Sequence, residues 1–360
     1  MNAKKDILIL LTVQFGYHTD TYMYCKYLDK TKFNVSYICF DMGYPRICLS
    51  DIDVIYISMS KNKLLRYLTF MRRLIREIHI KKFLLIFHVH TKFTLLIRLV
   101  TLFKPVVLDV RSGDLNENRS IRLLRNLEIT IASFLYPSVS VISEGLASSL
   151  GIPEKKRFIL PLGGDLQNIP DKTFDTLRLL YIGTFDKRNI HVTIYGISDF
   201  RRKNPAIKIS YDIVGNGNDY SMKSISLAIK NTRSEGVINY HGRKNREELI
   251  PFLERNNIGI VFIPQKEYYD FQPSTKLFES FLAGMPVIAT NTFENRKEIK
   301  DNSGVLCEDN YNSFSDALHA IYKKRDRFNS VEIKRMYAAS SWENIVKSKV
   351  QPYFEKIIQG

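Results

Sequence analysis

Short apolar runs alternate with segments of helical periodicity along the first half of this 360-residue chain. Continuous apolar runs are typical of strands buried on both faces of a parallel sheet, and apolar residues three or four positions apart predict helices. The predicted strands are 7–13, 35–40, 54–57, 83–87, 106–110 and 139–142, and the predicted helices are 19–29, 63–78, 93–102 and 119–134. This alternation favours an α/β fold with a doubly wound, mostly parallel sheet.

A second alternating series follows a break in the pattern. Glycine, proline and polar residues dominate 160–172, which makes this segment the predicted linker. The later predicted strands are 177–182, 207–214, 237–240, 258–263, 287–289 and 305–306, with a final helical stretch at 333–358. We therefore expect two Rossmann-like domains, 1–165 and 166–335, and a C-terminal segment, 336–360. Ligands of such sheets bind at the carboxyl ends of the strands, so we expect both domains to face one central cleft.

The charge narrows the choice of partners. Lysine and arginine number 53 against 37 acidic residues, a net charge of +16, which indicates nucleic acid, a membrane surface or a phosphate-bearing substrate. Residues 61–104 hold eleven of these cations against Glu77 alone, a net +10. On the predicted helix 63–78, apolar residues including Leu64, Leu68 and Ile75 share one side. We expect 61–104 to contact an anionic membrane; the alternative is a helix packed on the sheet with a solvated basic face.

The cysteines and the hydropathy of the chain indicate where in the cell the protein is expected. The four cysteines form no CxxC pair and no Cys/His cluster with zinc spacing, so a reducing, cytoplasmic setting is expected and no metal or cofactor is implied. No apolar stretch approaches the ~18 residues of a membrane span. We expect a cytoplasmic protein that is peripheral on the inner face of the membrane.

The most informative segment begins at Pro273, a residue suited to the first turn of a helix. Ser274 and Thr275 then lie near the helix start, where free backbone N–H groups and the helix dipole attract an anion. Lys276 adds a cation, and Glu279, one turn later, is placed to accept hydrogen bonds from a diol such as ribose. The alternative is an amphipathic helix entering a strand, with Glu279 solvated.

This segment and its Gly-Met-Pro-Val-Ile-Ala continuation resemble retaining glycosyltransferases of family 4, the group 1 type with the GT-B fold. In that family the glutamate holds the ribose of a sugar nucleotide. Residues 181–188 resemble the first strand and turn of the family's C-terminal domain, where a glycine and basic residues grip the diphosphate. Residues 214–217 and 240–243 resemble later turns of that domain. By this resemblance the donor-binding residues are Gly16, Gly183, Lys187, Arg188, Gly215, Arg243, Ser274, Thr275, Lys276 and Glu279.

The resemblance also implies a function. The enzyme would move a hexosyl group from a nucleotide-diphosphate sugar to an acceptor hydroxyl, with retention of configuration and no metal. The acceptor would be a lipid-linked or cell-surface glycan intermediate of polysaccharide, capsule or lipopolysaccharide biosynthesis, of a bacterial cell-surface type. Ser341-Trp342-Glu343 heads a helix that in the family crosses back onto the N-terminal domain.

The sequence departs from the family pattern at two places. Phe271, beside Asp270, stands where the family has a first glutamate, which puts the donor-sugar contact in doubt. Arg111 stands where many members have a histidine, and a guanidinium cannot act as a base. Arg111 could bind a phosphate or a developing charge, and Asp109 could accept the acceptor's proton, so both are candidate catalytic residues. The alternative is an Asp–Arg salt bridge at a strand end.

His88 and His90 occupy alternate positions of a predicted strand, so both could face the acceptor side of the cleft. A structural role for at least one of them is the alternative. Three other functions stay open: a sugar-nucleotide epimerase or hydrolase on the same fold, a basic nucleic-acid-binding protein, and a non-catalytic partner subunit. We expect no nucleic-acid partner, because the cations lie among aliphatic residues and outside any nucleic-acid motif.

Overall fold

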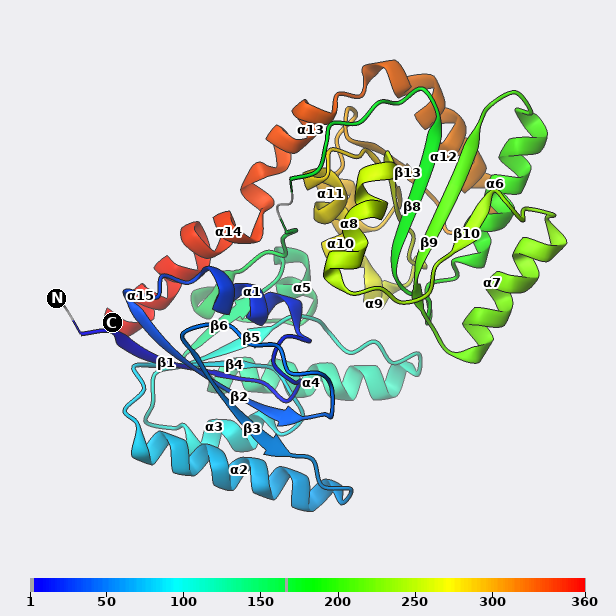
Figure 1. Ribbon diagram of the computed structural model, residues 1–360. Coiled ribbons are helices and arrows are strands. Elements are labelled where there is room, and N and C mark those ends of the chain that lie inside the picture. Colours follow the sequence, from blue (N-terminus) through cyan, green and yellow to red (C-terminus); the bar gives the residue numbers. More distant parts are fainter. Residues whose placement is uncertain (1–2, 166–167, 360) are drawn as a thin grey trace. The chain divides into compact units, whose positions relative to one another are not determined.

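The computed structural model describes residues 3–165 and 168–359. The chain divides into two compact units (Figure 1). Unit 1 consists of residues 1–161 and 342–360, and unit 2 of residues 162–341. Each unit contains one parallel sheet with helices on both faces, so the predicted fold class is confirmed.

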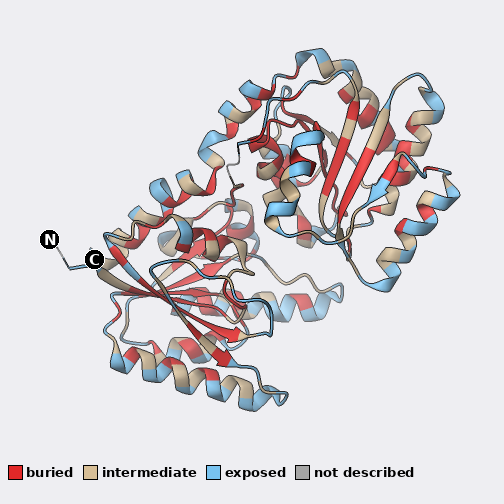
Figure 2. Ribbon diagram, in the orientation of Figure 1, coloured by how far each residue is buried: buried red, intermediate tan, exposed pale blue. Residues whose placement is uncertain are grey.

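The sheet of unit 1 has seven strands in the order β3-β2-β1-β4-β5-β6-β7. They are β1 Lys5–Leu10, β2 Phe33–Asp41, β3 Ile52–Ser58, β4 Leu85–Val89, β5 Val106–Val110, β6 Ser138–Val141 and β7 Arg157–Ile159. The helices are α1 Thr19–Tyr27, α2 Lys63–Ile80, α3 Thr94–Val100, α4 Arg119–Leu135, α5 Glu144–Ser149, α14 Trp342–Ile345 and α15 Gln351–Gln359, with a 3-10 turn at Glu154–Lys156 and a π-turn at Val346–Val350. The strands of both sheets are buried over most of their length (Figure 2).

The C-terminal segment belongs to unit 1, where aromatic rings attach it to the sheet and to α1. The Trp342 ring lies 6.1 Å from that of Tyr24 on α1. The Phe354 ring lies 5.1 Å from that of Phe87 on β4, and the Tyr353 ring stacks at 4.2 Å on that of Phe158. Such large rings bury much apolar area. The predicted return of the C-terminal helix to the N-terminal domain is therefore seen.

Helix α2 buries a different stripe from the predicted one. Phe70, Leu74 and Ile78 face the protein, and the Phe70 ring lies 5.1 Å from that of Phe40. Leu64, Leu68 and Ile75, predicted to share one apolar side with Ile78, are exposed instead. The 70-74-78 row follows the four-residue spacing of one helix face. This correction leaves apolar side chains on the outer surface of α2.

The sheet of unit 2 has six strands in the order β10-β9-β8-β11-β12-β13. They are β8 Leu177–Thr184, β9 Ile209–Asn216, β10 Ile238–Tyr240, β11 Ile258–Val261, β12 Val287–Thr290 and β13 Gly304–Cys307. The helices are α6 His191–Lys203, α7 Asp219–Asn231, α8 Arg246–Arg255, α9 Glu267–Asp270, α10 Thr275–Leu282, α11 Phe293–Glu298, α12 Tyr311–Lys324 and α13 Ser330–Tyr337, with 3-10 turns at Arg325–Arg327 and Ala338–Ser340.

The strand order of unit 2 places a topological switch point beside β8. The chain leaves β8 toward β9 on one side, and β11 lies on the other side of β8. The loops that follow β8 and β11 therefore diverge at the carboxyl edge of the sheet, which is the topological switch point. No helix in the described parts of either unit is long and apolar enough to cross a bilayer.

Candidate active site

Three glycines bring the backbone turns at the carboxyl edge of unit 2 together. Gly183 ends β8, Gly215 ends β9 and Gly242 follows β10. Gly215 has φ +152, and a Cβ there would lie 1.8 Å from the carbonyl oxygen of Gly183. Its N–H donates to the carbonyl of Gly242 at 2.9 Å. Only glycine permits this close approach, so these positions shape a bare backbone edge.

Arg188 lies in the turn after β8, between Lys187 and Asn189, whose positive φ angles of 58° and 53° curl the chain tightly. Its guanidinium carbon lies 4.6 Å from the centre of the Tyr269 ring, which belongs to α9 beyond β11. The two loops of the switch point are thus joined by a cation–π contact. Nη1 of Arg188 is buried and has no hydrogen-bond partner among the described residues. A buried guanidinium N–H gains a strong, charge-assisted hydrogen bond from an anion.

Helix α10 begins at Thr275, two residues after the predicted first-turn residue Pro273. Ser274 is the N-cap, and its hydroxyl accepts the N–H of Lys276 at 3.3 Å. Pro273 precedes the cap and is not in the first turn, so that part of the prediction is wrong. A serine hydroxyl satisfies a free N–H of the first turn, which explains why the helix starts at Thr275. The remaining free N–H groups of this turn keep their attraction for anions.

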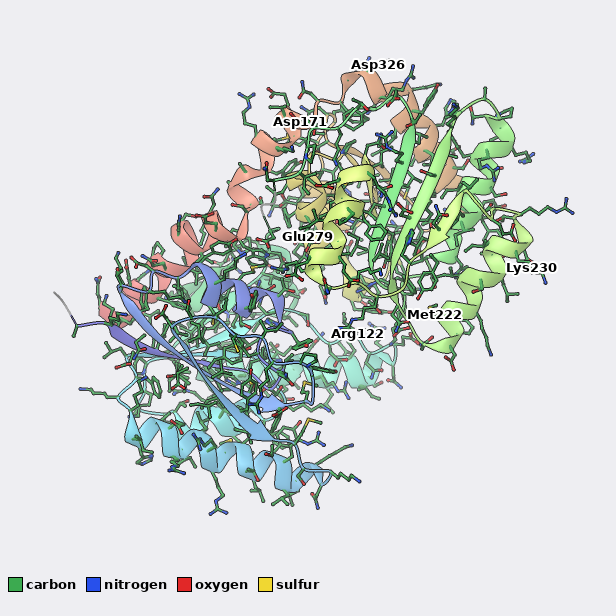
Figure 3. All side chains as sticks on the ribbon, viewed as in Figure 1. Arg122, Asp171, Met222, Lys230, Glu279 and Asp326 are labelled. Carbon is green, nitrogen blue, oxygen red and sulfur yellow. The ribbon has the colours of Figure 1, made fainter. Side chains whose placement is uncertain are left out.

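Lys276 and Glu279 pair with each other across one turn of α10. Nζ of Lys276 lies 2.7 Å from Oε2 of Glu279, and the two side chains are 33 % and 20 % exposed. Figure 3 labels Glu279 on α10. The pair is therefore preformed and partly open to a ligand. The two assigned contacts, to a diphosphate and to a ribose, stay predictions.

Gly164 packs closely against the backbone of α10, a contact that the sequence pattern did not predict. A Cβ at this position would lie 2.8 Å from the backbone nitrogen of Glu279 and 2.9 Å from the carbonyl carbon of Phe278. The Gly164 N–H also donates to the carbonyl of Ser340 at 3.0 Å. The Gly163-Gly164 pair in the sequence could have indicated it, but these glycines were assigned to the predicted linker. Gly164 is thus a positioning residue for Glu279.

A hydrogen-bonded cluster holds the loop after β10. Oδ1 of Asp212 lies 2.7 Å from Nε2 of His241, and Oδ2 accepts from Arg255 at 2.7 Å and from Asn256 at 2.9 Å. Burial would raise the pKa of the Asp212 carboxyl, but these hydrogen bonds outweigh it and hold the pKa below its ordinary value. Arg243, two residues beyond His241, is exposed. The cluster fixes the loop from which Arg243 projects.

Asp270 and Phe271, at the place of the family's first glutamate, have structural partners. Oδ1 of Asp270 accepts the N–H of Phe293 at 2.7 Å, in the first turn of α11. The Phe271 ring lies 5.2 Å from that of Phe293. The carboxylate of Asp270, next to Phe271, is therefore bonded to the start of helix α11.

In unit 1, Asp109 and Arg111 lie at the carboxyl end of β5 in a buried network. Nε of Arg111 donates to Oδ2 of Asp20 at 2.6 Å, and Nη1 donates to the carbonyl of Leu160 at 3.0 Å. Nη1 also lies 3.5 Å from Oδ1 of Asp109, which accepts the Ser140 hydroxyl at 2.7 Å. The Asp–Arg salt bridge considered above is therefore present. A role in the reaction stays a prediction for both residues.

Asp109 is completely buried, and burial raises the pKa of its carboxyl to about 6. Arg111 opposes this shift by stabilising the charged form. Oδ2 has no hydrogen-bond partner in the described part of the chain. The pKa of this carboxyl therefore lies well above the ordinary value for an aspartate.

His88 has structural partners, as the alternative for this pair allowed. It is wholly buried in β4, and its Nδ1 lies 2.7 Å from the Tyr136 hydroxyl, which donates to the carbonyl of Thr94 at 3.0 Å. Nδ1 therefore carries the proton. Burial lowers the pKa of His88 to about 3 and that of His90 to about 4. Both rings are neutral at pH 7.

Gly16 follows β1 with φ +90, and a Cβ there would lie 2.6 Å from Cδ1 of Ile47. The nearby Gln14 side chain bonds the backbone of the facing loop, donating to Tyr44 O at 2.8 Å and accepting from Met42 N at 2.8 Å. The glycine turn after β1 is therefore closely packed. No cluster of three or more potential metal ligands occurs in residues 3–165 and 168–359.

Comparison with known proteins places this geometry in context. Residues 176–324 match the family model of glycosyl transferases group 1. Sucrose-phosphate synthase from Thermosynechococcus elongatus superimposes with a TM-score of 0.78 at 15 % identity, over 99 % of this chain and 100 % of that one. Anabaena Alr3699/HepE in complex with UDP and glucose gives 0.77 at 10 % identity, over 98 % and 100 %.

The lipopolysaccharide outer core galactosyltransferase WaaB gives 0.72 at 13 % identity, over 98 % and 99 % of the two chains. No curated protein sequence matches this chain significantly. At these identities the likeness establishes the fold. The chain therefore has the GT-B fold of two Rossmann-like domains, and its residues 176–324 match the glycosyl transferases group 1 family.

Proposed function

We propose that this protein is a retaining glycosyltransferase that moves a hexosyl group from a nucleotide-diphosphate sugar to an acceptor hydroxyl. The observation that carries the proposal is Arg188, a cation with a buried, unpartnered nitrogen at the switch point of unit 2. The group 1 match, residues 176–324, lies within this unit. Neighbours of the same fold were solved with UDP and glucose, and with UDP-2-fluoro glucose, which supports a nucleotide-sugar donor.

The chemistry needs a stabilised leaving group. When the sugar departs, negative charge develops on the nucleotide diphosphate. Arg188, Lys276 and the first turn of α10 would stabilise that charge, so departure requires no protein general acid. Glu279, whose backbone packs closely against Gly164, would accept hydrogen bonds from the ribose hydroxyls.

For the acceptor we propose a lipid-linked or cell-surface glycan intermediate, met at the inner face of an anionic membrane. The net charge of +10 in residues 61–104 supports this location. WaaB, a lipopolysaccharide outer core galactosyltransferase, has the same fold and supports this class of acceptor.

A thermal-shift screen against UDP-, GDP-, ADP- and CMP-sugars tests the donor class. We expect one nucleotide to raise the melting temperature, since a ligand that binds only the folded state stabilises it. No shift with any donor would contradict the proposal. Turnover of the stabilising donor without an acceptor would favour an epimerase or hydrolase, and the anomeric configuration of a transfer product, read by NMR, tests retention.

A further inference from the structure

Helix α4 exposes most of its large apolar side chains to solvent. Its buried positions are Arg122, Ile129, Ala132 and Ser133, and Nη1 of Arg122, which Figure 3 labels, donates to the carbonyl of Asn116 at 2.7 Å. Large apolar side chains, 44 % to 70 % exposed, recur every three or four residues on the outside: Leu123, Leu124, Leu127, Ile131, Phe134 and Leu135. A surface helix of a water-soluble protein normally has the opposite arrangement.

Helix α3, next to α4, also exposes large apolar side chains to solvent. Thr94 and Ile97 are buried on the helix, and its C-cap Thr101 is also buried. Leu96 and Leu99 are exposed on the helix, as are Leu102 and Phe103 just after it, and Phe103 is 94 % exposed. Nε of Arg98 donates to the carbonyl of Leu135 at 2.8 Å, which joins α3 to the end of α4. The exposed apolar residues therefore form one surface across two helices.

Helix α2 adds cations to the same surface. It covers the same face of the seven-stranded sheet as α3 and α4 (Figure 1), and the rings of Tyr67 and Phe93 meet at 4.2 Å where α2 approaches the start of α3. Its outer side carries Arg72 and Arg76 beside the exposed leucines. Unit 1 contains 21 of the 27 large exposed apolar side chains found among the described residues.

We propose that the outer faces of α2, α3 and α4 form a membrane-inserting surface for anionic lipid. The apolar side chains of α3 and α4 enter the acyl region, while Arg72 and Arg76 bind lipid phosphates. The charge favours lipid over a second copy of this chain, because two such surfaces would bring the same cations together. This lipid contact rests on the proposed function at a membrane and assigns the contact to three helices. One of them, α4, lies outside residues 61–104, and none of the residues involved belongs to the donor site.

Co-sedimentation with phosphatidylcholine vesicles, with and without phosphatidylglycerol, tests this surface. We expect the wild type to bind the anionic vesicles. Leu124→Glu with Leu127→Glu should weaken binding about tenfold or more per leucine, because each apolar side chain loses its burial in lipid. Leu227→Glu is the matched control: this leucine is 57 % exposed on α7 of unit 2, and its variant should bind like the wild type.

The cations have their own test. Arg72→Glu with Arg76→Glu should lower binding to phosphatidylglycerol vesicles, and added salt should have the same effect on the wild type. Absence of wild-type binding, or equal loss in Leu124→Glu/Leu127→Glu and Leu227→Glu, would overturn the proposal. Light scattering that shows a dimer dissociated by Leu124→Glu/Leu127→Glu would also overturn it in favour of a second copy. Nucleotide-sugar binding by Leu124→Glu/Leu127→Glu should stay at the wild-type level, which separates this inference from the donor assignment.

Discussion

The carboxyl edges of the two sheets carry similar residue types in opposite environments. In unit 2, the ammonium of Lys276 and the carboxylate of Glu279 are partly exposed, and one nitrogen of Arg188 has no partner in the described chain. In unit 1, Asp109 is wholly buried, and Arg111 is bonded to Asp20 and to the backbone. Charged residues at equivalent edges of the two parallel sheets are thus partly open to solvent in unit 2 and buried in a hydrogen-bonded network in unit 1.

The largest effect is expected at Gly215, at the carboxyl edge of unit 2. Gly215→Ala would place a Cβ 1.8 Å from the Gly183 carbonyl oxygen and push the ends of β8 and β9 apart. We expect unit 2 to lose about 3 kcal/mol or more of unfolding free energy, measured by urea denaturation. Gly236→Ala is the control, since its φ is +82 but a Cβ there meets nothing within 4 Å. That variant should lose only about 1 kcal/mol from backbone strain. Equal losses would contradict the close-packed glycine edge.

Much of the fold could be predicted because buried parallel strands leave an unmistakable pattern. Strand β5 has the predicted bounds, 106–110, and each of its residues is buried. The edge strand β7 was missed because it has only three residues, all half-buried, and offers no continuous apolar run. Helix α2 was predicted at nearly its true length, but the face it buries was not, since Leu64 and Leu74 look alike in sequence.

Part of the candidate site was predicted from the sequence, and part was not. The segment from Ser274 to Glu279 was found because a cap, a cation and a carboxylate lie within two turns of one helix. The support from Gly164 and the contact of Arg188 with Tyr269 were missed, because they join residues far apart in the sequence. The burial of His88 and Asp109 depends on the helices that cover the sheet, which the strand pattern alone does not reveal.

His88 offers a second test of the structural reading of unit 1. Its pKa is about 3 in the folded protein, against 6.5 for a free histidine, so below pH 6.5 the unfolded state takes up a proton that the folded state refuses. The stability of unit 1 should therefore fall as the pH drops from 7 to 5. His88→Gln should lack about 2 kcal/mol of this fall. Urea denaturation at both pH values measures it, and identical pH dependence in the two proteins would indicate an accessible, ligand-facing histidine.

Asp109 should act with the opposite sign. Its pKa of about 6 lies above the ordinary 3.8, so between these values the folded state binds the proton more tightly. The cost of the buried charge is present above pH 6 and is relieved as the pH falls. Lowering the pH from 7 to 4.5 should stabilise the wild type relative to Asp109→Asn by about 2 kcal/mol. A relative loss over that range, in the same unfolding measurement, would mean that Arg111 dominates the carboxyl.

The most direct test of the central claim, that the edge of unit 2 binds the donor diphosphate, is calorimetric titration of the stabilising nucleotide sugar. Arg188→Ala and Glu279→Ala should each weaken binding about tenfold or more, as expected for loss of a charge-assisted hydrogen bond. Glu332→Ala removes a carboxylate from another i,i+3 pair of unit 2, with Arg335, and should bind like the wild type. Unchanged affinity in both Arg188→Ala and Glu279→Ala would contradict the assignment of this site.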